Sequence, residues 1–213
     1  MKAKKIIPVL LVLVFVTIML TACQDKESKE IAIDEYTDQV LGVTYSIYKL
    51  ENQSEETFYA KVTSVLPNAN YPDIVSITIP ATIVYKDIEY SVTTIGDLAF
   101  YKSDYDIIYL SQGITTIEKF AFSKAKATRI DLPTTIKSIG EYAFLNCTSL
   151  RDVYLYAIIP PELGEHAFSV VDAKTSKYVS SEILNIRVPS TALKRYNNII
   201  EYPQWEMYQG NIR

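Results

Sequence analysis

The sequence predicts a solenoid of short stacked strands. A phrase close to Ile-Gly-x-x-Ala-Phe recurs four times, at residues 95–100, 117–122, 139–144 and 163–168. Successive copies begin 22, 22 and 24 residues apart, and a fixed period of roughly 20–29 residues is typical of a solenoid with one short strand per turn. A single copy cannot bury its own apolar face, so the copies must stack to share one core.

Each turn also carries two apolar residues at alternate positions. Alternation predicts a strand whose apolar pair faces inward while its neighbours face outward. Proline ends three of these strands, because it cannot donate to a sheet ladder. The pairs are Ile77/Ile79, Ile108/Leu110, Ile130/Leu132, Val153/Leu155 and Ile186/Val188, and the prolines are Pro80, Pro133 and Pro189.

The second position of the phrase is Gly in three copies and Glu118 in the remaining one. The copies on either side have the same spacing, so the backbone path should be the same in all three. We therefore expect negative φ at Gly96, Glu118 and Gly140. Glycine would then serve close packing against the next turn rather than a left-handed conformation.

The third copy has the most specific pattern. Phe144, Cys147 and Leu150, followed by Val153 and Leu155, have the spacing F-x-x-C-x-x-L-x-x-V. This pattern resembles the BspA-like leucine-rich repeat family of bacterial surface proteins over residues 71–213. The resemblance implies a strand-rich leucine-rich-repeat solenoid (α/β by convention), right-handed, with a parallel sheet on one face and a role in cell-surface recognition.

The N-terminus predicts export and lipid anchoring. Three lysines precede an uncharged apolar run, residues 6–20, which is short for a membrane span of about 20 residues and fits a signal peptide. The segment Leu20-Thr21-Ala22-Cys23 resembles the lipobox of bacterial lipoproteins, with acyl chains such as palmitate on Cys23. We expect the outer membrane or surface of a Gram-negative cell rather than its inner membrane. The alternative is an uncleaved anchor with an incidental cysteine.

Five segments follow from these patterns. Residues 1–22 are the predicted signal peptide, and residues 23–39 are the lipidated Cys23 and a charged, solvated tether. Residues 40–72 form an N-terminal β-hairpin cap with strands at 43–48 and 58–65. Residues 73–189 are the repeats, with a second hairpin turning at Lys86-Asp87. Residues 190–213 form a C-terminal cap rich in aromatic residues.

The composition excludes several classes of function. Removal of residues 1–22 takes away three lysines and no acid, so the formal charge of −4 becomes −7, which argues against nucleic acid and anionic lipid as partners. The single histidine, His166, has only Glu165 beside it in sequence, too little for a catalytic base. Cys147 is left without a disulfide partner, and burial as a small apolar residue is favoured. No cofactor or metal is expected.

The outward face of the repeat strands is the best candidate for a functional surface. Tyr and Arg are enriched at recognition sites, and solenoids bind along extended sheet faces. The alternative is that these side chains only face solvent and link neighbouring strands, with Arg129 and Asp152 as a cross-strand pair. The candidate residues are Thr78, Ile107, Tyr109, Arg129, Asp131, Asp152, Tyr154 and Arg187.

Three functions remain open. The first is a non-catalytic binding or adhesion module whose partner is a host protein, a bacterial surface protein or a glycan, and which acts as a monomer anchored only by lipid. The second is a structural or accessory envelope lipoprotein without its own ligand. The third is a hydrolase, which no motif supports. An exposed aromatic and apolar patch would favour the first.

Overall fold

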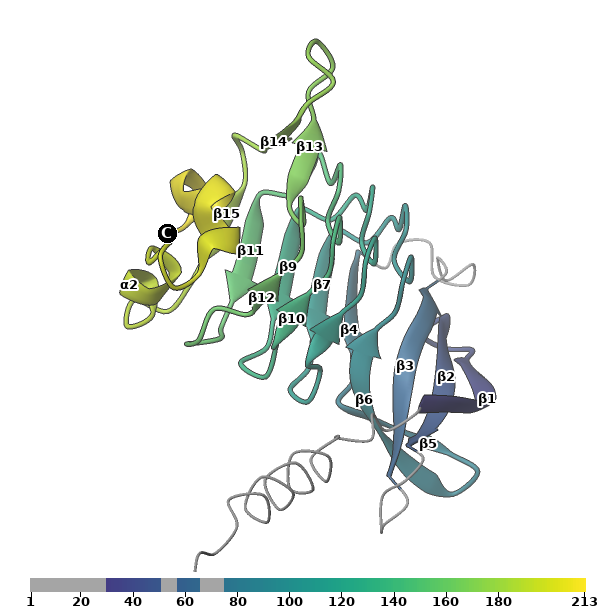
Figure 1. Cartoon of the computed structure of the whole chain (residues 1–213). Helices are drawn as coiled ribbons and strands as arrows, with labels where there is room; N and C mark the ends of the chain where they lie inside the picture. Colours follow the sequence, from purple (N-terminus) through teal and green to yellow (C-terminus); the bar gives the residue numbers. More distant parts are fainter. Residues whose placement is uncertain (1–29, 51–56, 66–74) are drawn as a thin grey trace, which may run out of the picture.

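The computed structural model describes residues 30–50, 57–65 and 75–213, which form a solenoid with a strand-built cap at one end and a helical cap at the other (Figure 1). One sheet has the strand order β1-β2-β3-β6-β8-β10-β12, with β5 paired to β6, and a second has the order β15-β11-β9-β7-β4. The predicted signal peptide and Cys23 lie outside the described residues.

The predicted repeat strands form the five-stranded sheet, and every neighbouring pair in it is parallel. The members of the first four apolar pairs are buried, and so is Ile186, whereas Val188 is half-buried just beyond the last strand. The sheet consists of β4 (Ser76–Ile79), β7 (Ile107–Leu110), β9 (Arg129–Leu132), β11 (Asp152–Leu155) and β15 (Asn185–Arg187).

A second set of parallel strands lies on another face of the coil, where the sequence predicted none. The first residue of each phrase pairs with its equivalent in the next turn. Turns that stack at a constant period bring these equivalent backbone groups into register, so even two residues can form a strand. The strands are β6 (Ile88–Ile95), β8 (Thr116–Ile117), β10 (Ser138–Ile139) and β12 (Glu162–Leu163).

The phenylalanines that end the phrases form one stacked column in the core. Their ring centroids lie 4.7 Å (Phe100–Phe122), 4.9 Å (Phe122–Phe144) and 4.7 Å (Phe144–Phe168) apart. Each ring is at most 2% exposed. The alanine before each phenylalanine is also buried, and its small side chain leaves room for the rings of neighbouring turns.

The backbone of the phrases confirms negative φ at Gly96, Glu118 and Gly140. A Cβ on Gly140 would lie 2.6 Å from the Lys119 nitrogen, so glycine permits close approach to the preceding turn, not the next one. The left-handed conformation falls two residues later, on Leu98, Phe120, Tyr142 and His166, where φ is 54–58°.

The N-terminal cap corrects the predicted tether. Residues 30–38 form strand β1 (Glu30–Asp38), which pairs antiparallel with β2 (Val43–Leu50) and through it with β3 (Phe58–Val65). Tyr36 packs on Tyr45 and Tyr85, while the charged residues face solvent. A charged edge strand is a common defence against unwanted strand pairing, which explains why its composition resembles a tether. Residues 23–29 lie outside the described residues.

Strand β3 joins the cap to the repeats, because it pairs parallel with β6. The predicted second hairpin is present, with β5 (Thr82–Tyr85) antiparallel to β6. Its turn residues Lys86 and Asp87 have φ of 52° and 63°, as a tight type I′ turn requires. A further hairpin, β13 (Ser169–Val171) with β14 (Tyr178–Ser180), projects from the last turn (Figure 1).

The C-terminal segment closes the other end of the Phe column. Helix α2 (Leu193–Tyr196) and the 3-10 helix η1 (Pro203–Asn211) bring Tyr196, Trp205 and Tyr208 onto the last turn. The Trp205 indole donates to the Pro161 carbonyl at 3.1 Å, and the Tyr196 hydroxyl donates to the Ala157 carbonyl at 2.9 Å. These bonds satisfy the polar ends of the buried rings.

Cys147 is 4% exposed, and its thiol donates to the Phe122 carbonyl. Burial raises the pKa of this thiol to about 12, so the residue behaves as the small core side chain that the sequence predicted. None of the helices in the described ranges is both long and apolar enough to span a membrane.

Candidate binding face

The five-stranded sheet brings the predicted outward residues together in two columns. Strand register aligns Thr78, Tyr109, Asp131, Tyr154 and Arg187 in one column. The other column contains Ser76, Ile107, Arg129, Asp152 and Asn185. The structure therefore places all eight candidates on one side of one sheet.

Tyrosine and arginine side chains alternate along this face. The Arg129 guanidinium lies 4.1 Å from the ring centroid of Tyr154 and 5.8 Å from that of Tyr109. The Arg187 guanidinium lies 5.6 Å from the Tyr154 ring. Because β11 lies between β9 and β15, the Tyr154 ring has an arginine on each side. We call these four residues, Tyr109, Arg129, Tyr154 and Arg187, the Tyr-Arg row.

The ion pairs differ from the predicted Arg129–Asp152 pair. Arg129 binds Asp131 on its own strand through two hydrogen bonds of 2.6 and 2.8 Å, and Asp152 accepts from Arg187 at 2.7 Å. Residues two apart on a strand share a face, and the arginine fork matches the carboxylate. Hydrogen bonding to Asp131 raises the pKa of Arg129, and Asp131 is only 8% exposed.

The exposure of the other candidates is uneven. Thr78 is exposed, whereas Ile107 and Tyr109 are half-buried, so Ile107 does not present a free apolar side chain. Sequence reasoning missed Tyr156, which is exposed, packs near Tyr154 and donates to Asp131 at 3.2 Å. The sequence feature that could have revealed Tyr156 is its place directly after Leu155, the last inward-facing residue of β11.

His166 lies away from this face, among aromatic rings at the base of the β13–β14 hairpin. Its ring centroid is 4.2 Å from that of Tyr178 and 5.7 Å from that of Tyr142. The side chain is 17% exposed, and Nε2 lies 3.3 Å from a Glu165 oxygen. His166 occupies the same position in its phrase as Leu98, Phe120 and Tyr142, which also have a left-handed backbone conformation. Within the described ranges, no three His, Cys, Asp or Glu side chains gather to hold a metal ion.

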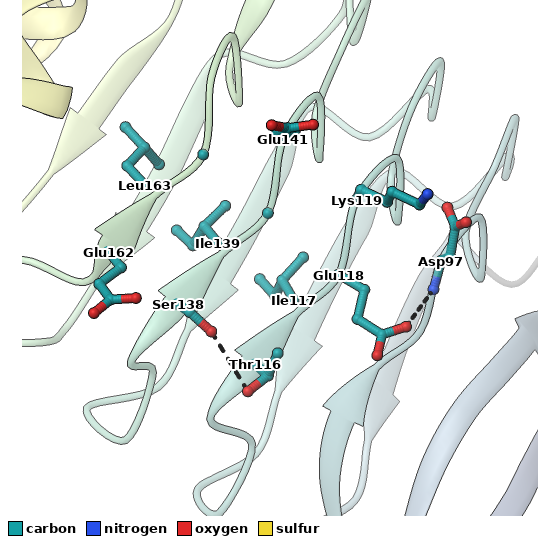
Figure 2. Close-up of a pocket in the computed structure, with 12 residues that line it drawn as sticks. Asp97, Thr116, Ile117, Glu118, Lys119, Ser138, Ile139, Glu141, Glu162 and Leu163 are labelled. Atoms are coloured by element: carbon teal, nitrogen blue, oxygen red, sulfur yellow. Dashed lines mark hydrogen bonds between the residues drawn. The ribbon is translucent and has the colours of Figure 1, made fainter. Parts of the chain in front are cut away.

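A groove of about 700 Å³ lies on the other sheet, across β8, β10 and β12. Figure 2 shows Thr116, Ser138 and Glu162 side by side at the start of these strands and Glu141 beyond the end of β10. The sequence did not predict this groove, because its residues come from four different turns, and the spacing of the phrases does not show how closely those turns approach one another.

Comparison with known proteins agrees with this architecture. Residues 69–198 match the family model described as the BspA type leucine rich repeat region (6 copies). The chain belongs to this family of leucine-rich repeat proteins. No curated relative matches the chain.

Solved structures with similar folds include a leucine rich cell surface protein from Faecalibacterium prausnitzii, with 24% identity and a TM-score of 0.52. The similarity covers 76% of this chain but only 38% of that protein. A leucine-rich repeat protein from Bacteroides capillosus has 24% identity and a TM-score of 0.40, with 73% and 83% covered. The first of these likenesses supports a shared leucine-rich-repeat fold.

Proposed function

We propose that this protein is a non-catalytic binding or adhesion module of the bacterial cell surface, and that it binds its ligand through the Tyr-Arg row. The observation that carries the proposal is the mutual ordering of these four side chains on the outer side of one sheet. Tyr and Arg dominate binding hot spots. Side chains that are already held by neighbours lose little further freedom on binding, which favours affinity.

The geometry favours a protein ligand over a glycan. Sugar rings bind proteins by stacking on exposed aromatic faces, but arginines flank the Tyr154 ring on both sides. Tyr109 and Tyr154 are half-buried and Arg187 is exposed, so the row presents a partner with an edge on which aromatic and cationic groups alternate. A protein surface with carboxylates and apolar side chains complements that edge.

The test is a binding screen of residues 24–213, which contain every described element, against extracellular-matrix proteins, bacterial surface proteins and a glycan array. A Tyr154→Ala, Arg187→Ala double variant should lose binding to any ligand found. The matched control is Tyr101→Ala, because Tyr101 is 41% exposed outside this sheet. Binding that survives the double variant would place the ligand elsewhere.

We further propose that the protein is held by lipid on Cys23, in the outer membrane or on the surface of a Gram-negative cell. This proposal rests on the segment Leu20-Thr21-Ala22-Cys23 and on the short apolar run before it. A Cys23→Ser variant should leave the membrane fraction. Its recovery there at the parent's yield would contradict lipid anchoring.

The second candidate is a structural envelope protein without its own ligand. The observation in its favour is that Arg129 and Arg187 already have carboxylate partners, as they would in a row that only stiffens the sheet. This function predicts no ligand in the screen and a lower melting temperature for the Tyr154→Ala, Arg187→Ala variant.

A further inference from the structure

The groove on strands β8, β10 and β12 has a floor of small residues. The first outward position on these strands is held by Thr116, Ser138 and Glu162, and the hydroxyl oxygens of Thr116 and Ser138 lie 3.5 Å apart. Gly140 and Gly164 follow in the next outward position. A Cβ at either glycine would collide with the backbone of the preceding turn, so the floor is held low by the stacking of the turns.

The groove runs from the N-terminal cap toward η1. Glu118 stands at the end nearest the cap, where its carboxylate accepts from Lys61 Nζ at 2.6 Å and from the Asp97 nitrogen at 3.0 Å. At the other end, Leu163 and Gly164 also line a smaller cavity of about 380 Å³ beside η1. Neighbouring strands lie about 4.8 Å apart, so the path from β8 to η1 accommodates roughly four to five extended residues.

The lips of the groove are acidic. Asp97, Glu118, Glu141 and Glu162 line it, and Lys119 is the one basic side chain among its lining residues. Glu118 is neutralised by Lys61. Glu141 and Glu162 are exposed and have no ion pair with any described residue. Figure 2 shows Glu162 at the start of β12 and Glu141 beyond the end of β10, so their carboxylates lie at opposite ends of the strands.

We propose that this groove docks an extended, cationic segment of a partner polypeptide. Successive side chains of an extended chain point to opposite sides. A segment lying over Gly140 and Gly164 therefore directs alternate lysines or arginines toward Glu141 and Glu162. Charge complementarity selects a basic occupant, and the glycine floor lets its backbone lie close to the sheet. This surface is separate from the Tyr-Arg row, so either proposal can fail without the other.

The probe is a fluorescent peptide of alternating lysine and serine, five residues long, titrated with residues 24–213 and followed by anisotropy at low salt. A Glu141→Lys, Glu162→Lys variant should bind about tenfold more weakly or worse, because each reversal replaces an attraction with a repulsion. The matched control is Glu35→Lys, Glu89→Lys, which makes the same change in net charge on exposed residues of β1 and β6. Equal losses in both variants would show nonspecific attraction and overturn the proposal, as would a parent that does not bind.

A neutral variant separates the groove from its charge. Ser138→Trp fills the floor without altering any ionisable group, and it should weaken peptide binding at least as much as the charge reversals. Its melting temperature should remain near that of the parent, since Ser138 faces outward. Ser138→Trp that folds and binds like the parent would show that the groove is not the docking site.

Discussion

Lys61 Nζ lies 2.6 Å from Glu118 Oε1, and this ion pair joins strand β3 of the N-terminal cap to the second phrase of the repeats. The two side chains are 15% and 32% exposed. Burial alone would lower the pKa of Lys61, but the hydrogen bond and charge of Glu118 outweigh it and raise that pKa above its usual value. The residue that breaks the glycine pattern thus connects two modules.

Glu118→Gly should destabilise the protein by about 1–2 kcal/mol, since it leaves Lys61 partly buried without its partner and adds chain entropy. A double-mutant cycle with Lys61→Met, followed by urea denaturation, should give a coupling energy of about 1 kcal/mol. A Glu118→Gly variant more stable than the parent would mean that Glu118 is strained, contrary to its negative φ.

Phe122→Ala should cost about 3–5 kcal/mol, the usual effect of deleting a buried aromatic side chain. The rings of Phe100 and Phe144 both stack on Phe122, so both neighbouring turns lose packing. Thermal melts measure the loss. The control is Ile200→Ala, at a side chain that is 93% exposed, which should change stability by less than about 0.5 kcal/mol.

Asp131→Asn should destabilise the protein by about 1–3 kcal/mol, because the half-buried Arg129 guanidinium loses its two-point carboxylate partner. Asp152→Asn is the comparison, since its partner Arg187 is 45% exposed and such pairs contribute about 0–1 kcal/mol. Equal effects in chemical denaturation would show that the two pairs are equivalent, against the difference in burial.

Acid should weaken the attachment of β1. The hydrogen bond from Lys86, together with those from the Glu35 nitrogen and Tyr85, lowers the pKa of Asp34. A carboxylate with a lowered folded pKa stabilises the protein above its unfolded pKa of about 3.9 and loses that contribution as the pH falls through the lowered value.

The urea midpoints of the parent and of Asp34→Asn should therefore stay apart from about pH 6 to about pH 4 and converge as the pH falls below about 4. Lys86→Met should already reduce the difference near neutral pH, because it removes the main partner of Asp34. A gap that is constant across this pH range would exclude a charged role for Asp34.

Much of the fold was predictable because the same pattern of residues recurs in several successive turns. The repeat period and the alternation of apolar residues predicted the repeat strands, the Phe column and the inward-facing pairs. Each of these features depends only on contacts within one turn or with the equivalent residue of the next turn. Strand β1 was not predictable from composition, because solvent-exposed edge strands and tethers share the same charged residues. What distinguishes the two is the pairing of β1 with β2 and the contacts of Tyr36 with Tyr45 and Tyr85.

The site was predictable in place but not in detail. The alternation put Arg129 and Tyr154 on the outer face, whereas the choice of Asp131 over Asp152 as the partner of Arg129 depends on side-chain reach within that face. The groove was not predictable, because its floor depends on how closely Gly140 and Gly164 approach the preceding turn. Sequence spacing shows which residues are equivalent but not how near they lie.

The nearly constant ring separation in the Phe column has a consequence for how this protein can change length. The interface between each turn and the next is therefore almost the same as the interface between that turn and the preceding one. Insertion or loss of a whole turn, which is 22 or 24 residues long in the existing copies, would therefore re-create an interface that already exists, while a fraction of a turn would displace a phenylalanine from the column. The two ends cannot vary in this way, because β3 and Trp205 each fit a single partner surface. Growth is confined to the middle of the molecule and proceeds in whole turns.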